Sequence, residues 1–153
     1  AFKLLEAERT FNLPLDRFSN ALDLGAAPGG WTSVLLERGL KVTAVDPAEM
    51  DPSLVVHPNL RHIRRNAADV SFAPGTFDLF VCDMSWDPHH TSRIVSGLAP
   101  SITAGGSGII TLKLMHGKAF QTIREAQAAA DDRRFDGGVR PLFRHSSSEA
   151  VVP

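Results

Sequence analysis

Apolar stretches of strand length alternate with stretches of helical spacing along most of the chain. The first kind predicts β-strands at Ala21–Gly25, Lys41–Val45, His62–Arg65, Phe77–Cys82, Gly108–Leu114, Val139–Phe143 and Glu149–Val152. The second kind predicts helices over Trp31–Arg38, Arg93–Leu98 and Lys118–Ala130. Strands that are separated by helices of this length form βαβ units. The pattern therefore predicts an α/β fold with a mostly parallel central sheet.

The first predicted strand runs into a glycine-rich turn at residues 25–30, and the next helix begins at about Gly30. Gly25, Gly29 and Gly30 have no Cβ, so a ligand can approach the backbone closely. The free N–H groups at the start of the helix face an anionic group, and Pro28 stiffens the turn. The spacing Gly-x-x-x-Gly-Gly differs from that of dinucleotide-binding turns. We interpret the turn as a nucleotide-type cofactor site, with an ordinary loop as the alternative.

Charged residues stand at strand ends, where open parallel sheets bind their ligands. Asp46 ends the second strand, 21 residues after Gly25, a spacing at which a carboxylate typically binds a ribose diol. Alternatively, Asp46 is a turn carboxylate before a proline. Asp83 ends a strand and Lys113 lies within one, and both strands are otherwise apolar. Two opposite charges at the same end of neighbouring strands indicate a functional pair, although Lys113 could instead extend to solvent.

Residues 23–31, Asp-Leu-Gly-Ala-Ala-Pro-Gly-Gly-Trp, resemble motif I of the FtsJ-like RNA ribose 2′-O-methyltransferases, which use S-adenosylmethionine. Four further positions resemble the Lys-Asp-Lys-Glu tetrad of that family: Lys3 in Ala-Phe-Lys-Leu-Leu-Glu, Asp83 in Asp-Met, Lys113 in Leu-Lys-Leu and Glu149 in Ser-Ser-Ser-Glu-Ala-Val. The resemblance covers essentially the whole chain. It is closest to the RlmM-type branch, which methylates a cytidine ribose in large-subunit ribosomal RNA.

The resemblance implies a Rossmann-like class I methyltransferase fold, with helices on both faces of the sheet and an antiparallel last strand. It implies that Lys3, Asp83, Lys113 and Glu149 are catalytic. The cofactor-binding residues that it implies are Gly25, Ala26, Ala27, Pro28, Gly29, Gly30, Trp31, Asp46, Asn66, Asp69 and Asp83.

The chain departs from the family pattern at Asn66, where a carboxylate commonly contacts the adenine amino group. Asparagine can still accept that hydrogen bond through its side-chain oxygen. Asp69 is the other candidate for this contact. Either residue could instead simply cap a loop.

The chemistry of methyl transfer explains the four tetrad positions. A ribose 2′-hydroxyl is a poor nucleophile until its proton leaves, so catalysis requires alignment and a general base. A free lysine has a pKa of about 10.4 and is protonated at neutral pH. A second cation at Lys3 and partial burial would lower the pKa of Lys113, whereas Asp83 and Glu149 would raise it. We predict Lys113 as the base and Asp83 as the residue that positions it.

Composition limits the fold and the partners. A chain of 153 residues, 43% of them hydrophobic, can form one domain, which we expect to span residues 1–153. The sequence begins at Ala1 without a methionine, as expected of a segment trimmed from a longer chain. The net charge of −1 gives no global attraction to nucleic acid, so contacts with RNA must come from local patches. The oligomeric state stays open, and a monomer is compatible with the sequence.

Other residue patterns point away from metal sites and membranes. Cys82 is the sole cysteine, which excludes an internal disulfide and fits a reducing cytoplasm. The segment Asp87-Pro88-His89-His90 offers no third metal ligand at a diagnostic spacing, so we interpret it as a solvated loop and expect no metal. No apolar run reaches membrane-spanning length.

These observations favour an enzyme that methylates a ribose 2′-hydroxyl of RNA, most simply of ribosomal RNA. Two alternatives stay open. A methyltransferase for a small molecule or a protein would keep the cofactor motif but would not need the tetrad. A non-catalytic paralogue that binds cofactor or RNA would be favoured if Asn66 reflects lost cofactor affinity.

Overall fold

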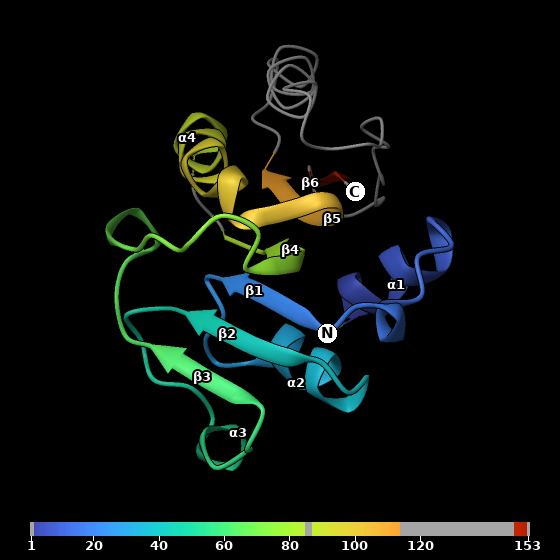
Figure 1. Ribbon diagram of the computed structural model, residues 1–153, viewed down its shortest axis with the longest axis vertical. Helices are drawn as coiled ribbons and strands as arrows, with labels where there is room; N and C mark the ends of the chain where they lie inside the picture. Colours follow the sequence, from blue (N-terminus) through green and yellow to red (C-terminus); the bar gives the residue numbers. More distant parts are fainter. Residues whose placement is uncertain (1, 85–86, 114–148, 153) are drawn as a thin grey trace.

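The computed structural model describes residues 2–84, 87–113 and 149–152, and Figure 1 shows its helices and strands. In chain order the α-helices and strands are α1 (Phe2–Thr10), β1 (Asn20–Leu24), α2 (Gly30–Glu37), β2 (Lys41–Val45), α3 (Pro52–Val55), β3 (Leu60–Ile63), β4 (Phe77–Cys82), α4 (Pro88–Leu98), β5 (Ile102–Lys113) and β6 (Glu149–Val152). Three short 3₁₀ helices complete the set: η1 (Leu15–Arg17), η2 (Ala67–Asp69) and η3 (Ala99–Ser101).

The strands lie side by side in the order β3-β2-β1-β4-β5-β6 (Figure 1). Strands β1 to β5 are parallel to one another, and β6 pairs antiparallel with β5. The prediction of an α/β fold with a mostly parallel sheet is confirmed. The chain adds strands outward from β1 to β3 and then returns to place β4 on the other side of β1. This reversal opens a crevice at the carboxyl ends of β1 and β4, where sheets of this kind bind ligands.

Apolar side chains cover both faces of the sheet. On one face, Leu4 of α1 and Leu35 of α2 pack with Val81 of β4 in one buried cluster. On the other face, Ile94 of α4 packs with Phe80 of β4 in a second cluster. The alternation of Phe80 and Val81 between the two clusters follows from the two-residue period of a strand. Helices therefore cover both faces, as expected.

Two predicted strand boundaries were wrong. The third strand is Leu60–Ile63 rather than His62–Arg65, because its pairing partner is β2 and the ladder begins opposite Val42. The fifth strand begins at Ile102 rather than Gly108. The strand contains an irregularity before Ser107, where the register against β4 shifts between Phe77 and Leu79.

The helix expected at Arg93–Leu98 begins earlier, at Pro88. The segment that we interpreted as a solvated loop is therefore its first turn. The side chain of Asp87 accepts a hydrogen bond from the His89 N–H at 2.8 Å, and Pro88 occupies the first helical position. An N-cap aspartate followed by proline is a common helix start, which the sequence interpretation missed.

The sequence pattern predicted no element over residues 2–10, where the structure has α1. Leu4 and Ala7 of this helix are buried against the sheet. Glu8 of α1 accepts hydrogen bonds from the Arg38 guanidinium, the shorter at 2.8 Å, and from the Leu15 N–H at 3.0 Å. These contacts hold α1 across α2, so that the start of α1 faces the sheet.

Two predicted elements, Lys118–Ala130 and Val139–Phe143, lie outside the described residues. Across the described ranges, none of the helices has the length and apolar character required to cross a membrane.

Candidate active site

The turn after β1 has the tight backbone that its glycines predict. Gly25 has φ +67° and Gly29 has φ +122°, conformations that side chains with a Cβ rarely adopt. The peptide bond between Ala27 and Pro28 is cis. A Cβ on Gly25 would overlap the Met84 side chain, and a Cβ on Gly29 would overlap that of Leu54. The two glycines therefore let neighbouring side chains pack onto the turn.

Asp46 joins this turn to the end of β2. Its Oδ2 accepts a hydrogen bond from the Ala27 N–H at 3.1 Å, and its Oδ1 accepts one from the Ala48 N–H at 2.8 Å. The Gly25 N–H also donates to the Val45 carbonyl at 2.9 Å. Asp46 thus has the turn role that we considered as its alternative. Each carboxylate oxygen retains a further lone pair, so a ribose contact stays a prediction.

A pocket of about 290 Å³ opens at the carboxyl ends of β1, β2 and β4. It is lined by Gly25, Val45, Asp46, Pro47, Ala67, Asp83 and Met84. Three of the predicted site residues, Gly25, Asp46 and Asp83, are thereby brought together from segments far apart in the sequence. The pocket lies at the reversal of strand order, as the fold requires of a ligand site.

The other predicted cofactor residues surround the pocket without lining it. Ala26, Ala27, Pro28 and Gly29 form the turn beside it, and Gly30 begins α2. Trp31 is 5% exposed and packs in the core between α2 and the sheet. Its side chain therefore stabilises the position of the helix, and its contribution to a ligand site would be indirect.

Asn66 and Asp69 lie at the two ends of η2. Asn66 is the N-cap residue of this short helix, but its side chain makes no capping hydrogen bond. The Asp69 N–H donates to the Asn66 carbonyl at 3.0 Å. Between them, Ala67 reaches the pocket, whereas both polar side chains are exposed. Which of the two contacts an adenine stays a prediction.

Lys3 and Asp83 form an ion pair at the edge of the pocket. The Lys3 Nζ lies 3.4 Å from the Asp83 Oδ1, and the two side chains are 28% and 32% exposed. The residues are 80 positions apart in the chain and meet because α1 lies against the carboxyl end of β4. Partial burial leaves each charge accessible to a ligand and shields the pair from bulk water. This contact joins two members of the predicted tetrad.

The other two members are opposite one another in the sheet. Lys113, the last residue of β5, pairs with Glu149, the first residue of β6. Cys82 is aligned with Ile110 in the β4–β5 ladder, so Lys113 stands two positions beyond the level of Asp83. The backbone thus brings both pairs to the same edge of the sheet. The roles of the four residues stay predictions.

Asp23 is a site-adjacent residue that the sequence interpretation missed. It lies in β1 with 1% exposure, and its Oδ2 accepts a hydrogen bond from the Thr32 Oγ1 at 2.7 Å. This bond connects β1 to α2 behind the glycine-rich turn. Burial raises the pKa of Asp23 to about 7, and the charges of Asp83 and Asp46 add to the rise, while the hydrogen bond from Thr32 opposes it. The signal was present in the sequence as a carboxylate within an apolar strand.

Cys82 and the histidines of the described segments do not form a metal site. Burial raises the pKa of the Cys82 thiol to about 12, as expected for a small core residue. Within residues 2–84, 87–113 and 149–152, no three His, Cys, Asp or Glu side chains gather in a way that could hold a metal ion.

Comparison with known proteins identifies the family. The pattern of FtsJ-like methyltransferases matches residues 1–150. The chain belongs to the FtsJ-like methyltransferase family. This FtsJ-like chain is 37% identical over 158 residues to the ribosomal RNA large subunit methyltransferase M of Alkalilimnicola ehrlichii, covering 99% of the chain and 43% of the relative. It is 40% identical over 108 residues to the protein of the same name from Halorhodospira halophila, covering 70% of the chain and 31% of the relative.

The chain thus spans less than half the length of these relatives. Among solved structures, it resembles the 1,6-didemethyltoxoflavin-N1-methyltransferase of Burkholderia thailandensis, which was solved with 1,6-didemethyltoxoflavin and S-adenosylhomocysteine. The TM-score is 0.72 at 16% identity, over 97% of this chain and 73% of that protein. A likeness at this identity confirms the Rossmann-like methyltransferase fold of this FtsJ-like chain.

Proposed function

We propose that this FtsJ-like domain transfers a methyl group from S-adenosylmethionine to a ribose 2′-hydroxyl of ribosomal RNA. The observation that carries the proposal is the Lys3–Asp83 ion pair beside the pocket at the carboxyl end of β4. Small-molecule methyl transfer would need the pocket alone. The ion pair is half-buried and lies at the end of β4, and Lys113 ends the neighbouring strand β5. Charged residues in this arrangement suit the removal of a proton from a hydroxyl group.

The residues that line the pocket suit S-adenosylmethionine in their chemistry. Gly25 lines the pocket, and because it has no Cβ the Met84 side chain can pack against it and form part of the same wall. Asp46 has lone pairs for the two hydroxyl groups of a ribose, and its position is fixed by two backbone N–H groups. Ala67 and Met84 offer apolar surface for a flat base. The bound cofactor would supply an electrophilic methyl group that needs only an aligned nucleophile.

The charged residues of this chain would manage the proton of the attacking hydroxyl. Lys113 must be neutral to accept that proton, and an isolated Asp83 carboxylate would oppose this by raising the pKa of a nearby lysine. The ion pair with Lys3 offsets the charge of Asp83. Asp83 could then orient the base through hydrogen bonding without keeping it protonated. Glu149, the cross-strand partner of Lys113, would stabilise the lysine once it carries the proton.

Substitution of the base separates this mechanism from simple cofactor binding. Lys113→Ala should lower the rate of rRNA methylation by roughly 10²–10⁴-fold, the usual contribution of a general base, with cofactor affinity nearly unchanged. Lys113→Arg should be almost as inactive, because a guanidinium stays protonated. The measurements are methyl transfer to rRNA from cells that lack the gene, and calorimetric titration with S-adenosylmethionine.

The matched control is Lys41→Arg, at an exposed position where β2 begins, which is at the opposite edge of the sheet. This variant should methylate rRNA at the wild-type rate. A Lys113→Arg enzyme that is equally active would eliminate Lys113 as the base. A wild-type protein that binds the cofactor but methylates no rRNA would contradict the proposed substrate.

A further inference from the structure

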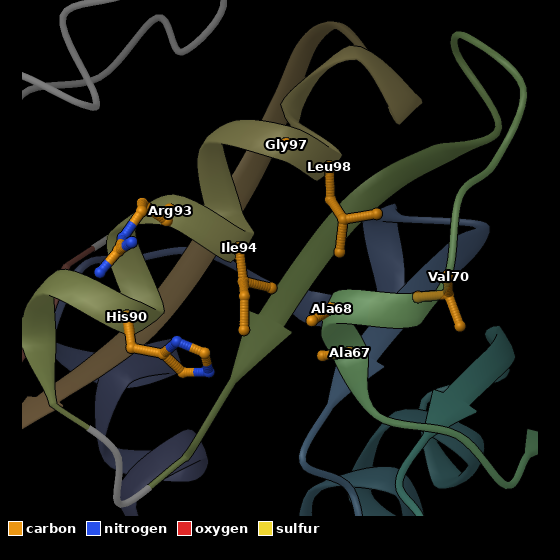
Figure 2. A pocket seen from close by; sticks show the side chains of 8 residues that line it. All are labelled: Ala67, Ala68, Val70, His90, Arg93, Ile94, Gly97 and Leu98. Carbon is orange, nitrogen blue, oxygen red and sulfur yellow. The ribbon is translucent and has the colours of Figure 1, made fainter.

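A second hollow of about 330 Å³ lies next to the candidate cofactor pocket, between η2 and α4 (Figure 2). The two hollows have Ala67 in common. Figure 2 shows Ile94 and Leu98 extending from α4 toward Ala67 and Ala68 on the opposite side. These four side chains give the groove an apolar floor. The volume of the groove is at the lower end of the range for small-ligand sites.

The rim of the groove is polar. Arg93 of α4 lines the groove at its rim, with its guanidinium directed away from Ala67 and Ala68 in the view of Figure 2. The His90 ring, one turn earlier, points across the groove (Figure 2). Among the described residues that line the groove, none is acidic, in a chain with 17 acidic residues and a net charge of −1. The lining side chains thus include one permanent cation, Arg93, and no anion, and Asp69 lies next to the groove between the lining residues Ala68 and Val70. The His90 ring above an apolar floor offers a surface on which a nucleobase can stack, and Arg93 offers a charge for its phosphate.

Gly97 is the residue of the groove that folding explains least. It lies within α4, where glycine costs about 1 kcal/mol relative to alanine. A Cβ at this position would meet no atom within 4 Å, so packing does not require glycine. Its φ also lies outside the left-handed range that favours glycine. Gly97 lines the groove without a side chain, so a larger residue at this position would take up space in the groove.

The groove is close in the chain to the candidate catalytic site. Asp83 follows β4, and α4 begins five residues later at Pro88. We propose that the groove binds one nucleotide of the RNA substrate that flanks the methylated nucleotide. Its base would lie on the apolar floor and its phosphate would contact Arg93. This inference rests on the proposed function, because it assumes that RNA is the substrate.

Two variants test the two halves of the proposal. Gly97→Leu fills the groove and should weaken binding of a fluorescein-labelled single-stranded RNA 12-mer by roughly tenfold or more, the effect of losing one stacked base. Arg93→Gln should weaken binding and lower the slope of log affinity against log salt by about 0.7, the value for one lost phosphate contact on a single strand. Calorimetric affinity for S-adenosylhomocysteine should not change in either variant.

Matched controls place the same changes outside the groove. Ser96→Leu adds the same side chain at an exposed neighbouring position of α4, and Arg9→Gln removes one positive charge from α1, on the opposite face of the sheet. Both should bind RNA as the wild type does. Gly97→Ala should raise Tm, because it removes a helix glycine, while weakening RNA binding less than leucine does. If Gly97→Leu does not fold, Gly97→Ala and Arg93→Gln decide the question.

The outcomes separate this inference from the proposed function. If both groove variants bind RNA like a wild type that methylates rRNA, the groove proposal is wrong and the proposed function stands. If Gly97→Leu weakens S-adenosylhomocysteine binding as much as RNA binding, the groove belongs to the cofactor pocket and the proposal is overturned. Equal affinity for free mononucleotides and for the 12-mer would also overturn it. A wild type that neither binds nor methylates RNA would refute both.

Discussion

The buried carboxyl group of Asp23 should make the stability of this domain depend on pH in an unusual direction. The residue is 1% exposed, and burial raises its pKa from 3.8 to about 7. Its ordinary value would apply in the unfolded chain, so between these pH values the folded state holds a proton that the unfolded state releases. The stabilisation is fully present below about pH 4 and is lost as the pH rises through 7.

The substitution Asp23→Asn isolates this effect. Asparagine is neutral at every pH, and its side-chain oxygen can still accept the hydrogen bond from the Thr32 hydroxyl. The free energy of unfolding of the variant should therefore exceed that of the wild type increasingly as the pH rises from 4 to 7. At about 1.4 kcal/mol for each pH unit, the difference above pH 7 should be on the order of 4 kcal/mol.

Urea unfolding at several pH values between 4.5 and 8 measures the difference directly. Asp16→Asn, which changes an exposed carboxylate in η1, shows what the loss of a surface charge does in the same window. An Asp23→Asn curve that runs parallel to the wild-type curve over the whole range would refute the reasoning. It would mean that Asp23 loses its proton as readily in the fold as in the unfolded chain.

Three further substitutions test other parts of the site. Gly25→Ala should destabilise the domain by about 1–3 kcal/mol in urea unfolding, and by more than Gly39→Ala does. Both positions have positive φ, but only a Cβ at residue 25 would overlap the Met84 side chain. Asp46→Ala should weaken binding of S-adenosylmethionine by about 1–3 kcal/mol in calorimetry, and unchanged affinity would contradict its role. Thr111→Val should stabilise the domain by about 1 kcal/mol in urea unfolding, since the buried Thr111 hydroxyl has no hydrogen-bond partner within the described structure.

Local sequence determined the parts of the fold whose signals lie within a few residues. The strand, turn and helix at residues 20–37 follow from an apolar run, a cluster of glycines and apolar residues at helical spacing. The structure gives two of these glycines, Gly25 and Gly29, a positive φ. The alternation of strands and helices likewise predicted a mostly parallel sheet, because parallel neighbours require a crossover connection. The motifs at Asp23–Trp31, Lys3 and Asp83 indicated the family that the comparison confirmed.

Boundaries were less predictable because neighbours determine them. β3 begins two residues before the predicted position, since the ladder with β2 decides which residues pair. β5 begins at Ile102, six residues before the predicted start at Gly108, because its first residue already pairs with β4 and the pairing resumes after the irregularity. The helix α1 was missed altogether. Its buried residues, Leu4 and Ala7, have a partner surface only once the sheet has formed.

The candidate site shows the same division between local and tertiary information. The sequence determined which charged residues stand at strand ends, since strands and their last residues are local features. Only the tertiary structure decided that Lys3 meets Asp83 across 80 positions, because that contact depends on where α1 lies on the sheet. It also decided that Asp23 loses nearly all contact with water and so holds its proton to a higher pH, because burial is a property of every element packed around a residue.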